Sequence, residues 1–345
     1  KEAGAIILGK TTTTEFATSD PSPAVNPWNP THTAGGSSSG SCVAVSSGMC
    51  PVALGSQTAG SVLRPAAYNG IVGFKPTYGR VSRHGVIPVS WSLDTVGILV
   101  RNVEDAAIML DILAGDDPKD PSSSPEPKDN YWQAIHSTES PPTIGLLRDY
   151  FYDYCTKEVQ SHTDDAVQHL ANAGARIEEV RLPKSFTSVR AAHSIIMNVE
   201  CAAFHQEMFK RHWQDYGPNL RQTIETGMLI PGVQYLQSQR MRRALNRDMN
   251  DLARKFDAIL TPCTPSEAPQ DLTTTGNPVL QAPWTFAGLP TITIPSGLAA
   301  SGLPLGIQMA SPSFYESELL RVANWCERSL GVSIEPPNFN DKTTT

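Results

Sequence analysis

Apolar and polar positions follow two different periods along this chain, and each change of period marks a predicted element. Residues 103–114 repeat apolar positions at helical spacing, and Gly115 follows where that helix should end. The runs 51–54 and 142–147 are short and apolar, which is typical of buried strands. Further helices are predicted at residues 39–48, 164–173, 191–212, 233–256 and 316–330.

The order of these elements predicts the fold class. Strands and helices alternate through residues 1–115, and short strands with Pro-Gly turns return over residues 257–310. Such a chain places helices on both faces of a sheet, so we predict an α/β fold. Residues 185–256 are predicted to form a mostly helical insertion near a pocket, and residues 338–345 a flexible tail.

Two glycine-flanked serines, Ser37 and Ser61, stand 24 residues apart. The first lies in Gly-Gly-Ser-Ser-Ser-Gly-Ser, and the second ends Gly-Ser-Gln-Thr-Ala-Gly-Ser. A short helix and a strand separate them, so both serines should return to the same end of that unit. Because glycine lets the backbone approach a ligand closely, the pattern predicts a catalytic centre built on hydroxyl groups.

Residues 35–77 resemble the signature block of the amidase signature family. Flanking segments resemble the family in the same order, at residues 3–11, 92–97, 103–107, 257–262, 288–295 and 302–308. The resemblance implies a single α/β/α domain around a large mixed β-sheet over residues 1–337. It also implies an enzyme that hydrolyses amide C–N bonds without a cofactor.

Members of that family use a Ser–cis-Ser–Lys triad, so the resemblance implies a role for each matching residue. Ser61 matches the nucleophile that forms the acyl-enzyme, and Ser37 matches the bridging serine that follows a cis peptide bond. The backbone N–H groups of Thr58, Ala59, Gly60 and Ser61 match the oxyanion hole. Amides at a tight turn that opens a helix point outward, which agrees with this assignment.

The lysine of the triad has no match in this chain. In the family it lies upstream of the signature block, so Lys1, Lys10 and Lys75 are not its equivalents. We therefore expect these 345 residues to lack an N-terminal segment of the natural protein that carries the lysine. Ala59 replaces a more usual glycine and Arg64 stands one residue late, which resembles free-standing amidases more than transamidating subunits.

Substrate contacts in this family come from variable segments, for which the sequence offers only candidates with core packing as the alternative. These candidates are Met197, Glu200, Phe204, Tyr235, Trp284 and Phe286. Asp94 could support the site from behind or be a buried carboxylate held by backbone donors, and the sequence leaves both open. His84 is the histidine expected nearest the pocket.

Three functions remain open at this point. The first is a free-standing amidase, as a monomer or homodimer, that acts on a small or aryl amide, a carbamate or a urea-type substrate. The second is a glutamine-hydrolysing amidotransferase subunit that works with a partner chain. The third is a catalytically inactive binding chain.

Two other motifs match by letters alone. Residues 4–11 fit the P-loop pattern, but their apolar middle, residues 5–8, reads as a strand rather than a phosphate-binding loop. Residues 36–40 fit Gly-x-Ser-x-Gly, yet no apolar strand precedes them, as a nucleophile elbow requires. Neither match changes the prediction.

The composition indicates which kinds of partner and which cellular compartment to expect. A net charge of −7 argues against a nucleic-acid surface, and no apolar run is long enough to predict a membrane span. The eight histidines show no metal-binding spacing, so no metal is expected. Six scattered cysteines predict reduced thiols and a cytoplasmic protein.

Overall fold

The computed structural model describes residues 3–136 and 140–337, and the predicted tail at 338–345 lies outside these ranges. The strands are β1 (Val52–Gln57), β2 (Val72–Lys75), β3 (Thr95–Val100), β4 (Thr143–Leu147), β5 (Arg176–Val180), β6 (Ala258–Pro262), β7 (Thr291–Leu298) and β8 (Pro304–Ala310). The helices are α1 (Ser39–Ser46), α2 (Leu63–Tyr68), α3 (Val103–Leu113), α4 (Tyr131–Ile135), α5 (Lys157–Asn172), α6 (Val189–His212), α7 (Pro218–Leu229), α8 (Gly232–Ala253), α9 (Ala282–Ala287) and α10 (Glu316–Leu330). Short 3-10 helices are η1 (Glu15–Ala17), η2 (Tyr152–Tyr154), η3 (Lys184–Ser188) and η4 (Trp213–Asp215).

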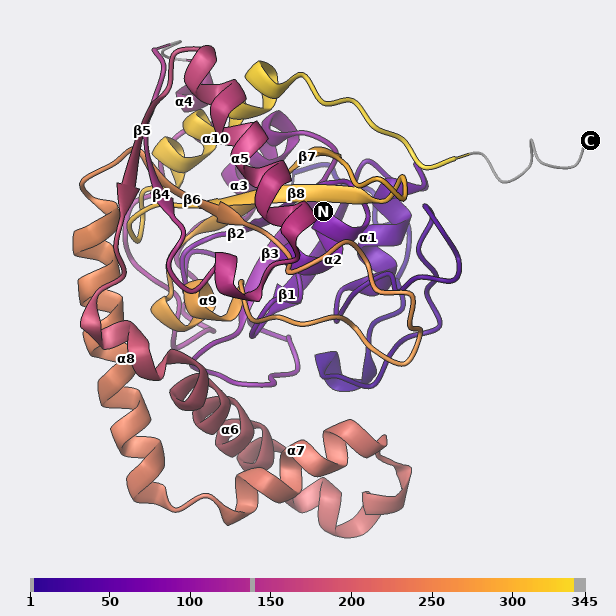
Figure 1. Cartoon of the computed structure of the whole chain (residues 1–345). Helices are drawn as coiled ribbons and strands as arrows, with labels where there is room; N and C mark the ends of the chain where they lie inside the picture. The colour runs from indigo at the N-terminus through magenta and orange to yellow at the C-terminus, as the bar shows by residue number, and fades with distance from the viewer. Residues whose placement is uncertain (1–2, 137–139, 338–345) are drawn as a thin grey trace, which may run out of the picture.

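The described strands form one mixed sheet in the order β1-β3-β2-β7-β8-β6-β4-β5 (Figure 1). Strand β4 pairs in parallel with β5 and β6, and the other described pairings are antiparallel. This is the predicted α/β fold with its mixed sheet.

Helices cover both faces of the sheet because alternate residues of a strand point to opposite faces. Ile98 of β3 joins a core cluster with residues of α3, α4, α5 and α10, whereas its neighbour Leu99 joins a cluster with α1 and α2. On β6, Leu260 faces the first cluster and Ile259 packs with residues of α6, α8 and α9. The three layers of the α/β/α prediction are therefore confirmed.

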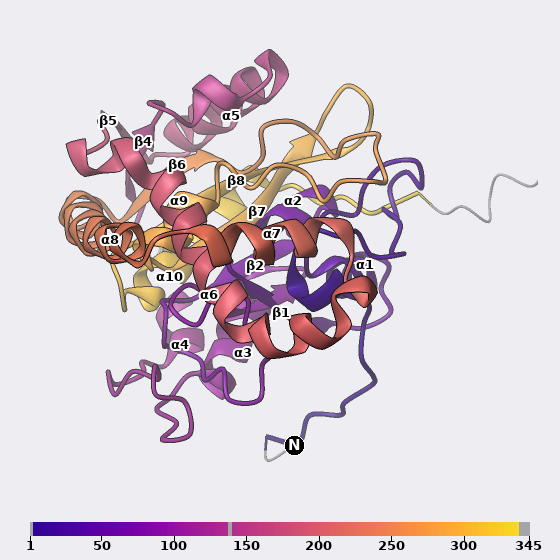
Figure 2. The ribbon, with the colours of Figure 1, turned by 90° about the horizontal axis from the view of Figure 1, so that it is seen from below.

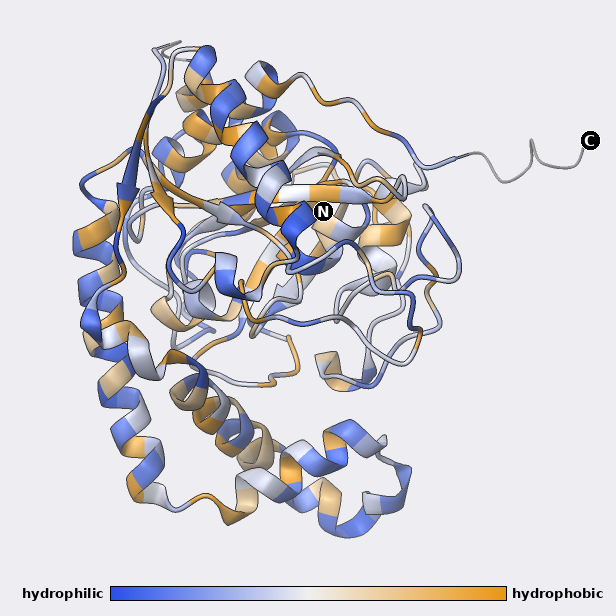
Figure 3. Cartoon of the chain, viewed as in Figure 1, coloured by the Kyte–Doolittle hydropathy of each residue, from blue (hydrophilic) through white to orange (hydrophobic). Residues whose placement is uncertain are grey.

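Residues 184–253 are almost entirely helical, close to the predicted span 185–256. Helix α8 runs along one side of the body, and α6 and α7 extend away from the sheet (Figures 1 and 2). Blue and orange stretches alternate along these helices (Figure 3), as expected for helices that bury one face. The N-terminal end of α7, at Pro218, is capped by a residue distant in sequence. Asp20 accepts hydrogen bonds from the N–H groups of Asn219 and Leu220.

The strand predicted at residues 5–8 is wrong. Ile6, Ile7 and Leu8 have no regular structure and are 84%, 70% and 72% exposed. An apolar run forms a strand only when a neighbouring strand satisfies its backbone, and no described strand lies beside this one. The helix predicted at 164–173 is also too short, because α5 begins at Lys157 after the capping residue Thr156.

Two paired glycines let both serine turns lie directly on the sheet. Gly55 of β1 faces Gly97 of β3 in the strand register. A Cβ atom on Gly55 would lie 2.4 Å from Oγ of Ser38, and one on Gly97 would lie 2.6 Å from Cγ2 of Val62. Ser38 and Val62 each follow one of the predicted catalytic serines, so these glycines set how close the turns approach the sheet.

We predict that Gly97→Ala lowers the free energy of unfolding by about 1–3 kcal/mol, because the new methyl group overpacks the contact with Val62. Gly232→Ala is the control, since nothing lies within 4 Å of a Cβ atom there and alanine favours the helix. Urea denaturation measures both variants. Equal stability of the two variants would contradict the proposed role of the glycine pair.

Candidate active site

The structure brings the two serine turns together. The backbone N–H of Ser38 donates to the carbonyl oxygen of Ser61 at 3.2 Å. Ser37 and Ser61 are both buried, and the Gly36–Ser37 peptide bond is cis, as the resemblance implies. The sequence prediction that both serines return to one end of the helix-strand unit is confirmed.

The turn that carries Ser37 is held from several sides. Its carbonyl oxygen accepts hydrogen bonds from Oγ1 of Thr13 at 2.9 Å and from the N–H of Thr14 at 3.2 Å. The carbonyl oxygen of Gly36 accepts one from the guanidinium of Arg64 at 2.7 Å. Burial lowers the pKa of Arg64 to about 10, so its positive charge is present beside this turn at neutral pH.

The loop before Ser61 is held by its carbonyl oxygens. Nε2 of His193 donates to the carbonyl oxygen of Thr58 at 2.9 Å. Oγ1 of Thr285 donates to the carbonyl oxygen of Ala59, also at 2.9 Å. His193 comes from α6 and Thr285 from α9, so two helices distant in sequence fix two successive peptide groups.

The next two carbonyl groups are held by the signature block itself. The carbonyl oxygen of Gly60 accepts the N–H of Arg64 at 3.0 Å, and that of Ser61 accepts the N–H of Ser38. In the part of the chain that the structure describes, no acceptor takes a hydrogen bond from the N–H groups of residues 58–61. In a trans peptide the C=O of one residue and the N–H of the next point in opposite directions, so the N–H groups of residues 59–61 point away from the donors that hold the carbonyl groups of residues 58–60.

The side chain of Gln57 binds the backbone N–H groups at the start of α2. Its Oε1 accepts the N–H groups of Val62 at 2.9 Å and Leu63 at 3.0 Å. Its Nε2 donates to Oγ1 of Thr285 at 3.0 Å. The amides of Val62 and Leu63 at the helix start are therefore satisfied by a side chain, unlike those of residues 58–61.

Asp94 is the buried carboxylate of one sequence interpretation, and its support of a catalytic site stays a prediction. Its Oδ2 accepts the N–H groups of Val89 at 2.9 Å and Ser90 at 3.0 Å, so it is a buried carboxylate held by backbone donors. Its Oδ1 accepts the hydroxyl group of Thr58, which places it directly behind the loop. Burial raises the pKa of Asp94 to about 6 despite these hydrogen bonds.

Glu200 and Tyr235 lie in a hydrogen-bond network that joins the helical insertion to the body. Oε1 of Glu200 accepts the hydroxyl groups of Tyr235 at 2.7 Å and Ser92 at 2.6 Å. Oε2 accepts the hydroxyl group of Ser90 at 2.5 Å. Both residues were candidates for substrate contacts, and the structure shows them bound to each other and to the loop at 90–92.

The remaining candidates for substrate contacts differ in burial. Trp284 packs in the core, where its ring stacks on Phe151 with centroids 5.4 Å apart. Phe286 is also buried, with its ring 6.1 Å from that of His193. Met197 is partly buried and Phe204 is 42% exposed. Contact of any of these side chains with a substrate stays a prediction.

Lys75 is fully buried at the end of β2. Its Nζ donates to the carbonyl oxygens of Pro76 at 2.9 Å and Leu289 at 2.6 Å. Burial lowers its pKa to about 7. These two carbonyl partners describe a structural lysine, in line with its exclusion from the triad on sequence grounds. His84, by contrast, is exposed.

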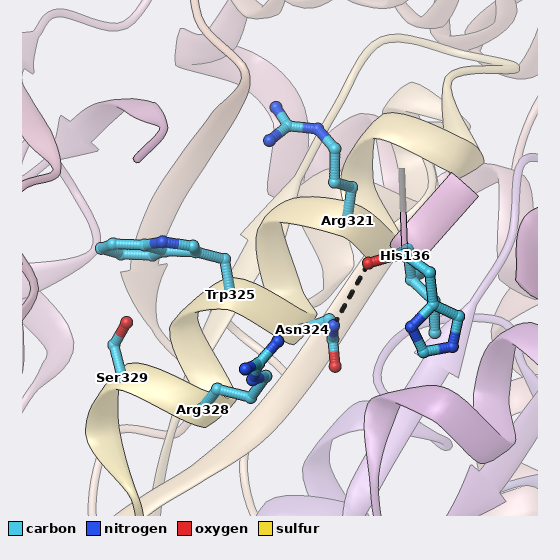
Figure 4. Close-up of a pocket in the computed structure, with 7 residues that line it drawn as sticks. His136, Arg321, Asn324, Trp325, Arg328 and Ser329 are labelled. Carbon is cyan, nitrogen blue, oxygen red and sulfur yellow. Dashed lines mark hydrogen bonds between the residues drawn. The ribbon is translucent and has the colours of Figure 1, made fainter. Parts of the chain in front are cut away.

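A pocket of about 290 Å³ lies on the other side of the sheet, beside α10 (Figure 4). The side chain of Asn324 in this pocket donates to the carbonyl oxygen of Ile135 at 3.4 Å. Arg321 forms an ion pair with Glu318. Because α10 packs on the face opposite α1 and α2, this pocket is separate from the serine turns.

Neither a metal centre nor a membrane span is found within residues 3–136 and 140–337. No group of three or more His, Cys, Asp or Glu side chains in these ranges could hold a metal ion. None of the helices there is long and apolar enough to cross a membrane.

The comparisons with known proteins agree with this geometry. The family model described as Amidase matches residues 1–320. A glutamyl-tRNA(Gln) amidotransferase subunit from Halothermothrix orenii is 34% identical over 375 aligned positions, which cover 98% of this chain and 78% of that protein. The corresponding subunit from Syntrophomonas wolfei is 36% identical, over 93% of this chain and 73% of that protein.

Solved structures show the same fold. A structure described as an unexpected vestigial protein complex that reveals the origins of an s-triazine catabolic enzyme has a TM-score of 0.88 and 30% identity, over 98% of this chain and 76% of that one. A peptide amidase in complex with chymostatin has a TM-score of 0.82 and 28% identity, over 98% and 77%. The chain therefore belongs to the amidase signature family, which contains hydrolases of amide C–N bonds.

The sequence did not identify His193 and Thr285 as partners of the loop at residues 58–61. Neither stands in the signature block, and no local pattern marks them, because each reaches the loop only through the packing of α6 and α9. Gln57 lies inside the segment that carries the resemblance, so the sequence located it without indicating what its amide binds.

We predict that Asp94→Ala lowers the free energy of unfolding by roughly 2–4 kcal/mol, because the N–H groups of Val89 and Ser90 lose their acceptor while buried. Asp94→Asn is the matched control, since one carboxamide oxygen can still accept both N–H groups. Urea denaturation at neutral pH compares the two variants. Equal losses in both would show that the acceptor oxygen is not what matters.

The pH dependence of stability tests the burial of His193. Burial lowers its pKa from 6.5 to about 4, so the unfolded chain binds the proton first as the pH falls. Between pH 6.5 and 4 the wild type should lose about 1.4 kcal/mol of stability per pH unit relative to His193→Gln. Above pH 6.5 the difference between the two proteins should be constant. Parallel curves through the acidic range would rule out a neutral, buried histidine.

Proposed function

We propose that the chain carries the nucleophile of an amidase that forms its acyl-enzyme on Ser61. The observation that carries this proposal is the loop at residues 58–61, whose carbonyl groups are all bound and whose N–H groups have no acceptor within the described residues. Such a row of fixed donors beside a buried serine suits the oxyanion that forms when a hydroxyl group attacks a carbonyl carbon.

Each step of the proposed hydrolysis uses a particular group of this site. Oγ of Ser61 attacks the amide carbon and passes its proton to Ser37, because a hydroxyl group can accept one proton while it donates another. The proton continues to a general base, which in this family is a lysine. The oxyanion accepts hydrogen bonds from the N–H groups of the loop at residues 58–61. The C–N bond then breaks, the amine leaves with a proton, and water hydrolyses the ester.

The substrate class has two candidates. The first is a small or aryl amide, a carbamate or a urea-type compound, which fits a free-standing enzyme. Ala59 and the position of Arg64 in the signature block favour this candidate. The names of the relatives favour the second candidate, a glutamine-hydrolysing amidotransferase subunit with a partner chain. Glutaminase activity and co-purification of a second chain would distinguish the amidotransferase from the amidase. A cytoplasmic location, which the scattered cysteines predict, is part of the proposal for both candidates.

We predict that Ser61→Ala lowers kcat by a factor of about 10⁴ or more in the protein as its gene encodes it, because the acyl-enzyme cannot form. The fold should be retained, since a buried hydroxyl group is replaced by a smaller side chain. Ser317→Ala, on the far face of the sheet, is the matched control. Hydrolysis at the wild-type rate by Ser61→Ala would exclude the proposed nucleophile.

Labelling with a fluorophosphonate tests the same assignment without a known substrate. Intact mass and peptide mapping should show one adduct on Ser61 in the wild type and none in Ser61→Ala. A correctly folded protein that takes no label would instead support the inactive binding chain.

A further inference from the structure

Two side chains outside the signature block hold the loop that ends at Ser61. His193 and Thr285 are 5% and 1% exposed. Their donor atoms lie 2.9 Å from the carbonyl oxygens of Thr58 and Ala59, respectively. The two donors therefore meet successive peptide groups of one loop, each from a different helix.

The direction of both hydrogen bonds is defined by chemistry. A carbonyl oxygen only accepts, so Nε2 of His193 carries the hydrogen and the neutral ring is in that tautomer. Oγ1 of Thr285 accepts from Nε2 of Gln57 at 3.0 Å, which leaves its own hydrogen for Ala59. Neither donor has a second acceptor among the described residues that would compete for its hydrogen.

We infer that His193 and Thr285 are positioning residues for the oxyanion-binding loop. By holding two carbonyl groups outward, they turn the following N–H groups, those of Ala59 and Gly60, toward the group that Ser61 attacks. The inference rests on the proposed function, because the direction of these N–H groups matters only if Ser61 forms an acyl-enzyme. Neither side chain touches the reacting atoms.

The loop cannot hold this arrangement by itself. Residues 58–61 lie between the end of β1 and the start of α2, so neither a strand partner nor a helical hydrogen bond fixes the first two peptide groups. Ala59 and Gly60 have no polar side chain that could replace an external donor. Without His193 or Thr285, rotation of a peptide plane would exchange the directions of its C=O and N–H groups.

Matched pairs of substitutions separate the hydrogen bond from packing. Thr285→Val keeps the shape and removes the donor, whereas Thr285→Ser keeps the donor. His193→Phe keeps a ring without a donor, whereas His193→Gln retains an N–H group at similar reach. Thr163→Val is the control, because Thr163 is equally buried and also donates to a carbonyl oxygen, on α5 away from the site.

The measurement is the labelling of Ser61 by a fluorophosphonate, resolved into a binding constant and a maximal rate of phosphonylation. This reaction develops negative charge on the phosphonyl oxygen and needs no knowledge of the natural substrate. We expect Thr285→Val and His193→Phe to lower the maximal rate about 10-fold or more while binding changes less than about 2-fold. Thr285→Ser and His193→Gln should recover most of the rate.

The double variant gives a second criterion. Because both donors act on the same loop, the combined loss in Thr285→Val with His193→Phe should be smaller than the product of the two single losses. Losses that multiply would mean that the two residues act independently, which overturns a shared positioning role.

The outcomes also separate this inference from the proposed function. Absence of label on Ser61 of the wild-type protein as its gene encodes it would overturn both. Normal labelling of the wild type, with the same maximal rate in Thr285→Val, His193→Phe and Thr163→Val, would overturn the positioning role alone. An equal loss in both members of each pair would assign the effect to packing and contradict the inference. If His193→Phe fails to fold, the threonine pair still decides it.

Discussion

Hydrogen bonds to the carbonyl oxygens of residues 58–61 are the constraint on which the site depends. The donors come from four parts of the chain: α6, α9, the first turn of α2 and the turn after Ser37. Within the described residues the N–H groups of this loop have no acceptor, and the proposed mechanism directs them to the oxyanion. Backbone dipoles fixed in this way need no reorganisation when negative charge develops, which is the physical basis of oxyanion stabilisation.

The helical insertion is therefore hydrogen-bonded to the loop that ends at Ser61. Glu200 binds the loop at 90–92, and Asp94 connects that loop to Thr58. His193 of α6 also donates to the carbonyl oxygen of Thr58. The insertion is therefore linked to Thr58 directly, through His193, and indirectly, through Glu200 and Asp94. Buried carboxylates are costly unless their oxygens are hydrogen-bonded, and both of these are. The network thus couples the insertion to the loop at 58–61 without a surface ion pair.

The fold does not identify the substrate, because relatives with different names share it. Solved structures of an amidotransferase subunit and of a peptide amidase share this architecture. A loop of backbone N–H groups recognises developing charge rather than the rest of a substrate. Selectivity must then come from the walls of the site. Trp284 lies in the core and Tyr235 binds Glu200, and the contact of either side chain with a substrate stays a prediction.

Hydrophobic periodicity in the sequence determined the layers, the helices α3, α6, α8 and α10 and the strands β1 and β4, because those elements bury one continuous face. The signature block likewise determined that Ser37 and Ser61 adjoin. Periodicity failed at residues 5–8, where an apolar run has no described neighbour to pair with, and at α7, whose cap, Asp20, is 200 residues away from Leu220. Only the tertiary structure decided that His193 and Thr285 hold the loop. A hydrogen bond to a backbone carbonyl depends on where two helices pack, and that distance leaves no pattern in the local sequence.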